Sequence, residues 1–381
     1  MKVYLDNAAT TPLDPEVFEA MKPYLLDNYG NPSSTHSHGR QVRSAIESAR
    51  KTVAELLKVS PGEIFFTSGG TEADNTLICS SISSYNLSHA ITSKIEHHAV
   101  LHTLENLETT GKIKLSYVNL DEKGNVDLDH LDELLAKNER SFVSLMHANN
   151  EIGNILDLKA TGEICKKHNA IFHSDTVQTM GHYAHNLSEL DVQCITGAAH
   201  KFHGPKGAGF MYIDKNTKIA PFIHGGAQER NMRGGTENVY GIIGTAKALE
   251  IAYREMAEHQ NHIQGLKDRM IDNLKNSIEG VSFNGESDNP EKSLYTVLNV
   301  CLPESQDNDM LLFTLDINGI SASGGSACSS GATTGSHVLA GIKTNPNRGA
   351  VRFSFSKYNT VEEIDYASEK IAEFYKQEAL K

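Results

Sequence analysis

The residue of this chain best suited to covalent chemistry is Lys201, which follows a histidine and precedes the turn-forming segment Gly204-Pro-Lys-Gly207. The apolar run that comes next, residues 208–213, is typical of a buried strand. A lysine held at a sharp turn between two elements has little freedom to move, and crowding there can lower its pKa. Such an amine is suited to forming a Schiff base with an aldehyde cofactor. The ordinary alternative is a surface lysine in a Gly/Pro loop, and this segment alone does not decide between the two.

A glycine turn, Ser68-Gly-Gly-Thr-Glu-Ala-Asp-Asn75, follows the predicted strand 63–67 and opens a helix. Free N–H groups and the helix dipole favour an anion at such a helix start, so the turn predicts a phosphate site. It lacks the lysine of a P-loop and the spacing of a dinucleotide fingerprint, which argues against a nucleotide. An ordinary capped turn between a strand and a helix is the alternative.

Three more polar residues closely follow predicted strands: Asp175, His97 and Asn150. Asp175 comes just past a buried strand, where a carboxylate is costly unless it is paired. The pyridinium nitrogen of pyridoxal phosphate would be such a partner, and Gln178 could then reach the ring hydroxyl. His97 could stack on the ring and act as an acid or base, although a lone histidine more often packs without a function. Asn150 is uninformative by itself.

Two residues of the C-terminal part are candidates for substrate chemistry. Arg352 lies in an otherwise apolar strand, so its guanidinium needs an acidic partner: a substrate carboxylate or a structural salt bridge satisfies it equally well. Cys328 is surrounded by small residues, and we favour an accessible, reactive thiol over an idle surface one. The other four cysteines lie in apolar or helical contexts typical of an inert core: Cys79, Cys165, Cys194 and Cys301.

Alternating elements would position these residues. Strand-like segments at 90–93, 141–146, 170–173 and 192–196 alternate with helical runs near 97–107, 128–136 and 159–168. This alternation predicts an α/β fold with a mostly parallel sheet and helices on both faces. In such folds the ligand lies at the carboxyl ends of the strands. Thr71, His97, Asn150, Asp175 and Lys201 all fall there.

The remaining segments complete two domains. A short strand within residues 1–12 precedes a helix that begins at Asp14-Pro15, and a long helix covers 37–57. Residues 238–278 are predicted to be largely helical and to lead into strands at 295–301 and 349–355, with helices at 309–315 and 361–375. We therefore expect a large domain of residues 15–250 and a small α+β domain of residues 1–14 and 251–381.

The composition excludes several classes of protein. The chain has 381 residues and a net charge of −13, which argues against nucleic acid or an anionic membrane as the main partner. No apolar run is long enough to span a bilayer, and the N-terminus is neither a signal nor a transit peptide. Five scattered cysteines without a CxxC pair favour a reducing cytoplasm over disulfides or a zinc site, so no metal is expected.

Together these motifs resemble the cysteine desulfurases of the NifS/IscS group, in the class V branch of fold-type-I pyridoxal-phosphate enzymes. The resemblance covers nearly the whole chain. It is carried by seven segments: Tyr4-Leu-Asp-Asn-Ala-Ala-Thr-Thr-Pro12, Gly30-Asn-Pro-Ser33, Thr67-Ser-Gly-Gly-Thr-Glu72, Met146-His-Ala-Asn-Asn-Glu-Ile-Gly153, Ala199-His-Lys201, Met232-Arg-Gly-Gly-Thr236 and Gly325-Ser-Ala-Cys328.

The resemblance implies a large domain with a seven-stranded sheet, pyridoxal 5'-phosphate as cofactor and L-cysteine as substrate. Lys201 would be the Schiff-base lysine, and Arg352 would hold the substrate carboxylate beside Asn150. Thr236 would reach the phosphate of a neighbouring subunit, which implies a homodimer with shared active sites. The other implied cofactor contacts are Gly70, Thr71, His97, Asn150, Asp175, Gln178 and His200.

In this family Cys328 would attack the sulfur of the cysteine–cofactor adduct, taking it as a persulfide and releasing alanine. The sulfur would pass to an acceptor or scaffold protein, for iron–sulfur cluster assembly or thio-modification. A selenocysteine or cystine lyase of the same family is the closest alternative, and Cys328 would matter less there. A non-catalytic regulatory homologue is a further alternative. The presence of Lys201, Asp175, His97 and Cys328 argues against it, because a binding module needs none of them.

Two features depart from the family pattern. Ala198 replaces a serine that usually binds the phosphate, and one hydrogen bond fewer costs about 1 kcal/mol, so we expect weaker retention of the cofactor. The chain stops at Lys381, whereas the IscS type continues into a tail that helps dock the scaffold. This second departure concerns scaffold binding and not the release of sulfur.

Overall fold

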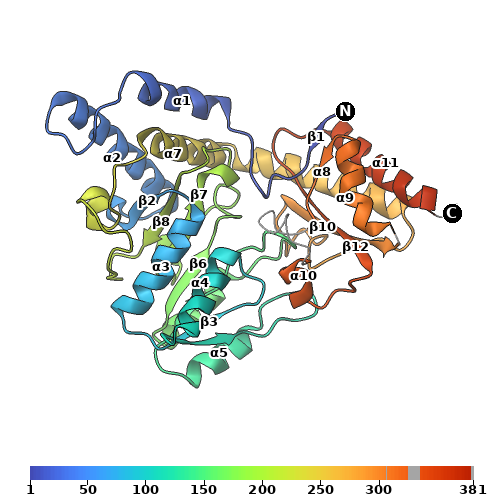
Figure 1. Cartoon of the computed structure of the whole chain (residues 1–381), viewed down its shortest axis with the longest axis horizontal. Helices are drawn as coiled ribbons and strands as arrows, with labels where there is room; N and C mark the ends of the chain where they lie inside the picture. Colours follow the sequence, from blue (N-terminus) through green and yellow to red (C-terminus); the bar gives the residue numbers. More distant parts are fainter. Residues whose placement is uncertain (306, 325–334, 379–381) are drawn as a thin grey trace.

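The computed structural model describes residues 1–305, 307–324 and 335–378. The larger of its two parts is built on a seven-stranded sheet, and Figure 1 shows how the elements are arranged. All neighbouring strands are parallel except where β8 pairs antiparallel with β2 and β7. The prediction of a mostly parallel seven-stranded sheet is confirmed. The strand order is β2 (Ile64–Thr67), β8 (Gly209–Ile213), β7 (Cys194–Ala198), β6 (Ile171–Asp175), β5 (Phe142–Ser144), β3 (His89–Thr92) and β4 (Lys114–Tyr117).

The direction of β8 follows from the short turn that joins it to β7. Residues 199–208 connect the two strands without a crossover helix, and such a connection can only return the chain antiparallel. The predicted reactive lysine, Lys201, lies in this turn and ends a single 3₁₀ turn, Ala199–Lys201. It is therefore held between two hydrogen-bonded strands.

Helices cover both faces of this sheet. On one face lie α3 (Gly70–Ser84) and α4 (His98–Thr109), and on the other α2 (Ser37–Leu57), α5 (Leu128–Ala136), α6 (Leu158–Lys167) and α7 (Val239–Arg254). Because helices cover both faces, successive side chains of a strand are buried on opposite faces of the sheet, as strand β2 shows. Ile64 and Phe66 are buried in the second set of helices, whereas Phe65 is buried against α3.

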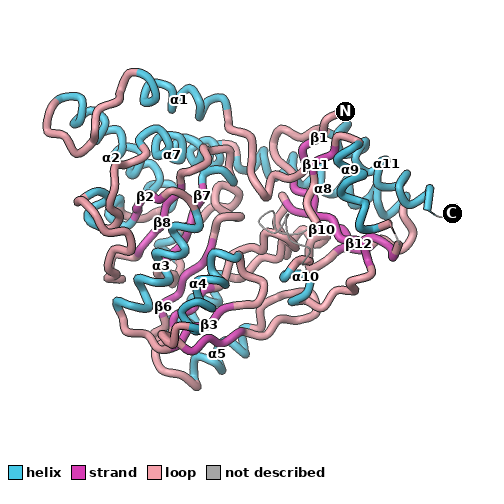
Figure 2. Tube along the Cα trace, in the orientation of Figure 1, coloured by secondary structure: helices cyan, strands magenta, loops and turns pink. Residues whose placement is uncertain are grey.

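A second core is built by the C-terminal part with the N-terminal strand. Strand β10 (Val297–Glu304) pairs antiparallel with β9 (Ser282–Phe283) and β12 (Arg348–Ser354), and β1 (Val3–Tyr4) pairs parallel with β11 (Ile320–Ser321). The helices that cover this core are α8 (Met256–Ser277), α9 (Leu311–Ile317) and α11 (Val361–Glu378), with α10 (His337–Gly341) nearby. Figure 2 shows this α+β part beside the large sheet. The division of the chain at residue 250 stays a prediction.

The N-terminal segment joins the two cores. Leu5 is buried in the second core, and the Ala8 N–H donates to Ser354 Oγ at 2.8 Å. Further along, the Thr11 N–H donates to the His200 carbonyl at 2.9 Å, beside Lys201. Residues 5–14 therefore run from the small sheet to the β7–β8 turn. Helix α1 (Pro15–Leu26) follows, capped by Asp14 as predicted, and packs on α7.

The prediction that residues 238–278 are largely helical is confirmed, but the stretch forms two helices. It breaks at Glu255, which ends α7 with φ −107° and ψ 10° although no glycine or proline marks the break. The edge strand β4 was not predicted, because Leu115 is its one fully buried residue and two-residue alternation is weak over so short a run. Among the described helices, none combines the length and apolarity needed to span a bilayer.

Candidate functional site

A cavity of about 190 Å³ lies where the carboxyl ends of the central strands meet the N-terminal segment and strand β12. Its lining brings together residues from both cores. Nine of the eleven predicted site residues line it: Gly70, Thr71, His97, Asn150, Asp175, Gln178, His200, Lys201 and Arg352.

The wall formed by the start of α3 is suited to an anion. Gly69 has φ +152°, which a side chain rarely allows, and a Cβ placed on Gly70 would lie 3.0 Å from the Val177 side chain. No side chain caps the helix, and the N–H of Ser68 is bonded to Glu72 at 3.1 Å. The first N–H groups of α3 thus face the cavity beside the exposed Thr71.

Lys201 reaches from the β7–β8 turn to the N-terminal segment. Its Nζ donates to the carbonyl oxygens of Ala8 at 2.5 Å and Ala9 at 2.9 Å. The Gln178 amide donates to the same Ala8 carbonyl at 3.1 Å. The turn and the N-terminal segment together hold the amine at the cavity wall.

Buried carboxyl groups give the floor of the cavity unusual electrostatics. Asp175 ends β6, is 5 % exposed and accepts from the Val177 N–H at 2.9 Å. Burial, reinforced by Asp74, raises its pKa to about 7. Burial likewise raises the pKa of Asp74 to about 7, although a hydrogen bond from Thr196 opposes this. Asp74 Oδ1 accepts no hydrogen bond from the described residues and lies 3.5 Å from His173 Nε2. A cationic ligand group would stabilise Asp175 in its charged form.

We expect Asp74→Asn to change how the stability of the ligand-free chain depends on pH. Between pH 4 and 7 the folded Asp74 keeps a proton that the unfolded chain has lost, so this residue makes folding less favourable as the pH rises. From pH 5 to pH 8 the free energy of unfolding of the wild type should fall by about 2 kcal/mol relative to the variant. Urea unfolding at both pH values measures the difference. Parallel pH curves would contradict a buried proton on Asp74.

Two histidines in the lining are neutral at pH 7. His97 caps α4 through Nδ1, which accepts from the Ala99 N–H at 3.2 Å, so its proton lies on Nε2. Burial, reinforced by Lys201, lowers the pKa of His97 to about 4. The same two causes lower the pKa of His200 to about 4, and its Nδ1 lies 3.2 Å from Thr10 Oγ1. His97 can therefore offer a hydrogen bond from Nε2 to a bound group.

Arg352 enters the cavity from β12 in the second core. It is 1 % exposed and has an acidic partner within the chain: Nη2 lies 2.8 Å from Asp6 Oδ1. Its Nη1 donates to the Asn150 carbonyl at 3.0 Å, whereas the buried Nε has no partner. The structural salt bridge considered from the sequence is thus present. It leaves a cationic group with a spare donor at the cavity wall.

Two predicted residues are not part of this lining. Thr236 is exposed and lies in a segment anchored by Glu229, whose carboxylate accepts from Arg50 at 2.7 and 2.8 Å and from the Phe66 N–H at 2.8 Å. Cys328 lies outside the described residues. Its role stays a prediction from the sequence.

The sequence reasoning missed Asp74, Asp6 and the carbonyls that hold Lys201. Asp74 could have been found, since it lies four residues after Gly70 and therefore on the same face of α3. Asp74, His97 and Asp175 also have ligand atoms within 4.8 Å of one another, a spacing that a metal ion could use. The anion-binding turn beside them instead suits one ligand with a cationic ring and an anionic group.

Comparisons with known proteins identify the family of the chain. Residues 3–367 match the family described as Aminotransferase class-V. The chain is 44 % identical over 371 residues to a cysteine desulfurase IscS of Dictyoglomus turgidum, covering 96 % of this chain and 92 % of that protein. A solved NifS-like protein superposes with a TM-score of 0.90 at 39 % identity, covering 99 % of this chain and all of the other. A structure of SspA in complex with cysteine has a TM-score of 0.81 at 28 % identity, covering 94 % of this chain and all of that one.

Proposed function

The chain belongs to the class-V aminotransferase family, and on that premise we propose that it is a pyridoxal-phosphate-dependent cysteine desulfurase. The observation that carries the proposal is the meeting of Lys201, Asp175 and Arg352 in one cavity beside an anion-binding turn. Relatives named cysteine desulfurase support the reaction, and a similar protein solved with cysteine supports the substrate.

The residues present fit pyridoxal phosphate. The start of α3, with Thr71, offers N–H and hydroxyl donors to a phosphate, and Asp175 offers a buried carboxylate to a protonated ring nitrogen. Ala198 lines the same cavity without a hydroxyl, so Thr71, the helix start and His200 would have to hold the phosphate. When bound, the cofactor would supply an aldehyde for an amine and a ring that draws electrons from the substrate Cα.

The chain's own groups then have distinct tasks. Lys201 Nζ would hold the cofactor and move a proton at the substrate Cα. His97 would donate a hydrogen bond from Nε2 to a bound group, and Asp175 would keep the ring nitrogen protonated. Arg352 binds the substrate carboxylate with the donors that Asp6 and Asn150 leave available.

Sulfur transfer requires a nucleophile, and we assign it to Cys328. Its thiolate attacks the sulfur of the substrate, a sulfur–sulfur bond forms, and the carbon–sulfur bond of the substrate breaks. The substrate carbon takes up a proton and leaves as L-alanine. The balance is cysteine plus enzyme thiol giving alanine plus enzyme persulfide, without an external oxidant.

A second copy of the chain would complete the site. Thr236 lies outside the cavity of its own chain and would reach that of a partner. Large apolar side chains that α1 and the segment after it expose support a contact between copies: Phe18, Leu25, Leu26 and Tyr29. The persulfide sulfur would pass to an acceptor protein, and we expect the reaction to take place in the cytoplasm.

The test is incubation of the purified protein with L-cysteine, followed by measurement of alanine and of the mass of the peptide that contains Cys328. We expect alanine together with a mass gain of one sulfur on that peptide. A control with a chelator present should release alanine at the same rate. Protein that binds the cofactor and releases no alanine would overturn the assignment of the substrate.

A further inference from the structure

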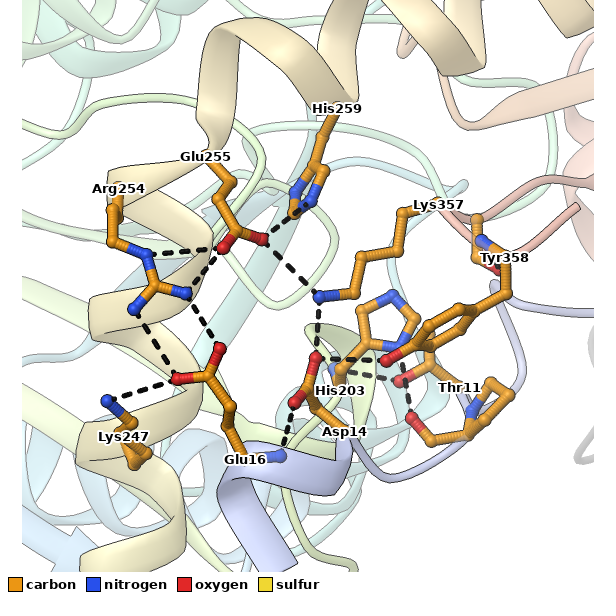
Figure 3. A network of polar contacts seen from close by, with 12 residues as sticks. Thr11, Asp14, Glu16, His203, Lys247, Arg254, Glu255, His259, Lys357 and Tyr358 are labelled. Carbon is orange, nitrogen blue, oxygen red and sulfur yellow. Dashed lines mark hydrogen bonds and ion pairs between the residues drawn. The ribbon is translucent and has the colours of Figure 1, made fainter. Parts of the chain in front are cut away.

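The two halves of the cavity come from different cores, and a polar network outside the cavity fixes one half against the other (Figure 3). Lys201 belongs to the large sheet and Arg352 to the small one. Each lies only a few residues along the chain from the network: His203 follows Lys201, and Lys357 follows Arg352 just beyond the end of β12. The contacts that hold Lys357 and His203 in place therefore also fix the distance between the Lys201 amine and the Arg352 guanidinium.

Lys357 and Asp14 form the centre of this network. Lys357 Nζ lies 2.6 Å from Asp14 Oδ2, with the two side chains only 12 % and 8 % exposed. The Tyr358 hydroxyl donates to the same carboxylate oxygen at 2.9 Å. Burial would raise the pKa of Asp14, but hydrogen bonds from Lys357, Tyr358 and the Glu16 N–H outweigh it and lower the pKa. The pair is thus charged at neutral pH and poorly screened by solvent.

The Lys357–Asp14 pair is also hydrogen-bonded to the turn that carries Lys201. The Asp14 N–H donates to the His203 carbonyl at 3.0 Å, and the His203 N–H donates to Thr11 Oγ1 at 2.8 Å. The His203 ring packs edge-on against Tyr358, with 5.1 Å between ring centres, and donates through Nδ1 to the Pro12 carbonyl at 2.9 Å. His203 has φ +66°, a costly value for a side-chain residue, so these contacts hold the turn in a defined conformation.

The network also reaches the connection between the two cores. Lys357 Nζ lies 3.7 Å from Glu255 Oε2, at the break between α7 and α8, and His259 Nε2 lies 3.1 Å from the same oxygen. Arg254 contacts Glu255 and lies 3.0 Å from Glu16 on α1. In Figure 3 Lys357 points between Asp14 and Glu255, so one ammonium group joins the N-terminal segment, the interhelix break and the end of β12.

We propose that Lys357 is a positioning residue that holds the Arg352 strand against the Lys201 turn and thereby sets the affinity for the substrate carboxylate. The identity of that substrate rests on the proposed function. Lys357 does not line the cavity, so its effect passes through Arg352 and should appear in KM more than in kcat.

The test compares four variants by steady-state kinetics with L-cysteine. Lys357→Met removes the charge and keeps the length of the side chain, and Lys357→Arg restores the charge. Asp14→Asn removes the partner charge but can still cap α1. Lys370→Met is the matched control, because Lys370 pairs with Glu373 at 2.7 Å on α11 of the same core, away from the network.

We expect Lys357→Met and Asp14→Asn each to raise KM about tenfold and to change kcat less than about threefold. Lys357→Arg should stay within about twofold of the wild type, as should Lys370→Met. A fifth variant that combines Lys357→Met with Asp14→Asn should be no worse than either single variant, because both substitutions remove the same contact. A lowered kcat at unchanged KM, or a loss of thermal stability alone, would overturn the positioning role.

Hydrogen exchange provides a second readout that does not depend on turnover. In Lys357→Met the amides of residues 6–14 and 348–354 should exchange faster than in Lys370→Met, whereas those of β6 should not change. Unchanged exchange in both segments would contradict the positioning role of Lys357, even if the enzyme uses cysteine as its substrate. If the wild type does not use cysteine, the proposed function fails, and faster exchange still supports the positioning role.

Discussion

Lys201→Ala should lower alanine formation from cysteine by about a thousandfold or more, because no other lysine lines the cavity within the described residues. Lys206→Ala is the matched control. Lys206 is an exposed lysine of the same turn, and its loss should leave the rate within about twofold of the wild type.

Lys201→Ala also removes the Lys201 hydrogen bonds to the Ala8 and Ala9 carbonyls, and among the described residues only Ala8 keeps a donor, from Gln178. The expected cost in stability is about 1–3 kcal/mol. Thermal melts of both variants separate this effect from catalysis. A folded Lys201→Ala protein with a rate near that of the wild type would show that the amine has no chemical role.

Cys328→Ala should abolish the persulfide and lower alanine release by about a thousandfold. The cysteines that the structure describes are poor substitutes. Burial raises the pKa of Cys165 and Cys194 to about 12 and that of Cys79 above its usual value, so few thiolates form there at neutral pH. Cys79→Ala is therefore the control, with an expected rate within about twofold of the wild type.

The Cys328 variant also separates the desulfurase from its nearest alternatives. A selenocysteine or cystine lyase would need no persulfide on Cys328 and would keep its rate in the variant. Alanine release at the wild-type rate, measured together with the mass of the Cys328 peptide, would favour such a lyase.

Local signals explain why much of the site could be predicted from the sequence. Gly204 and Pro205 identify the turn that holds Lys201, and Gly69 and Gly70 identify the start of α3. Asp175 ends strand β6 and His97 follows strand β3 closely, and parallel strands place such positions at one edge of a sheet. Local sequence was sufficient wherever one strand end and its turn determine the position of the side chain.

The remaining parts depend on contacts between distant segments. Asp6 neutralises Arg352 from the other end of the chain, and no spacing within either segment indicates this pair. Asp74 stands among polar and small residues of α3, and only the folded sheet shows how deeply it is buried. Glu255 breaks a helix without any local breaker, because the chain there passes from one core to the other.

The place of the N-terminal segment has a consequence for biosynthesis. Residues 3–8 are made long before residues 320–354, which supply their strand partners and the Arg352 ion pair. Closing so long a loop is entropically unfavourable until both cores exist. The large sheet can form during translation, but the carbonyls that receive Lys201 can be fixed only once residues 320–354 have been made. A nascent chain that lacks those residues therefore cannot complete this cavity for the cofactor and the substrate.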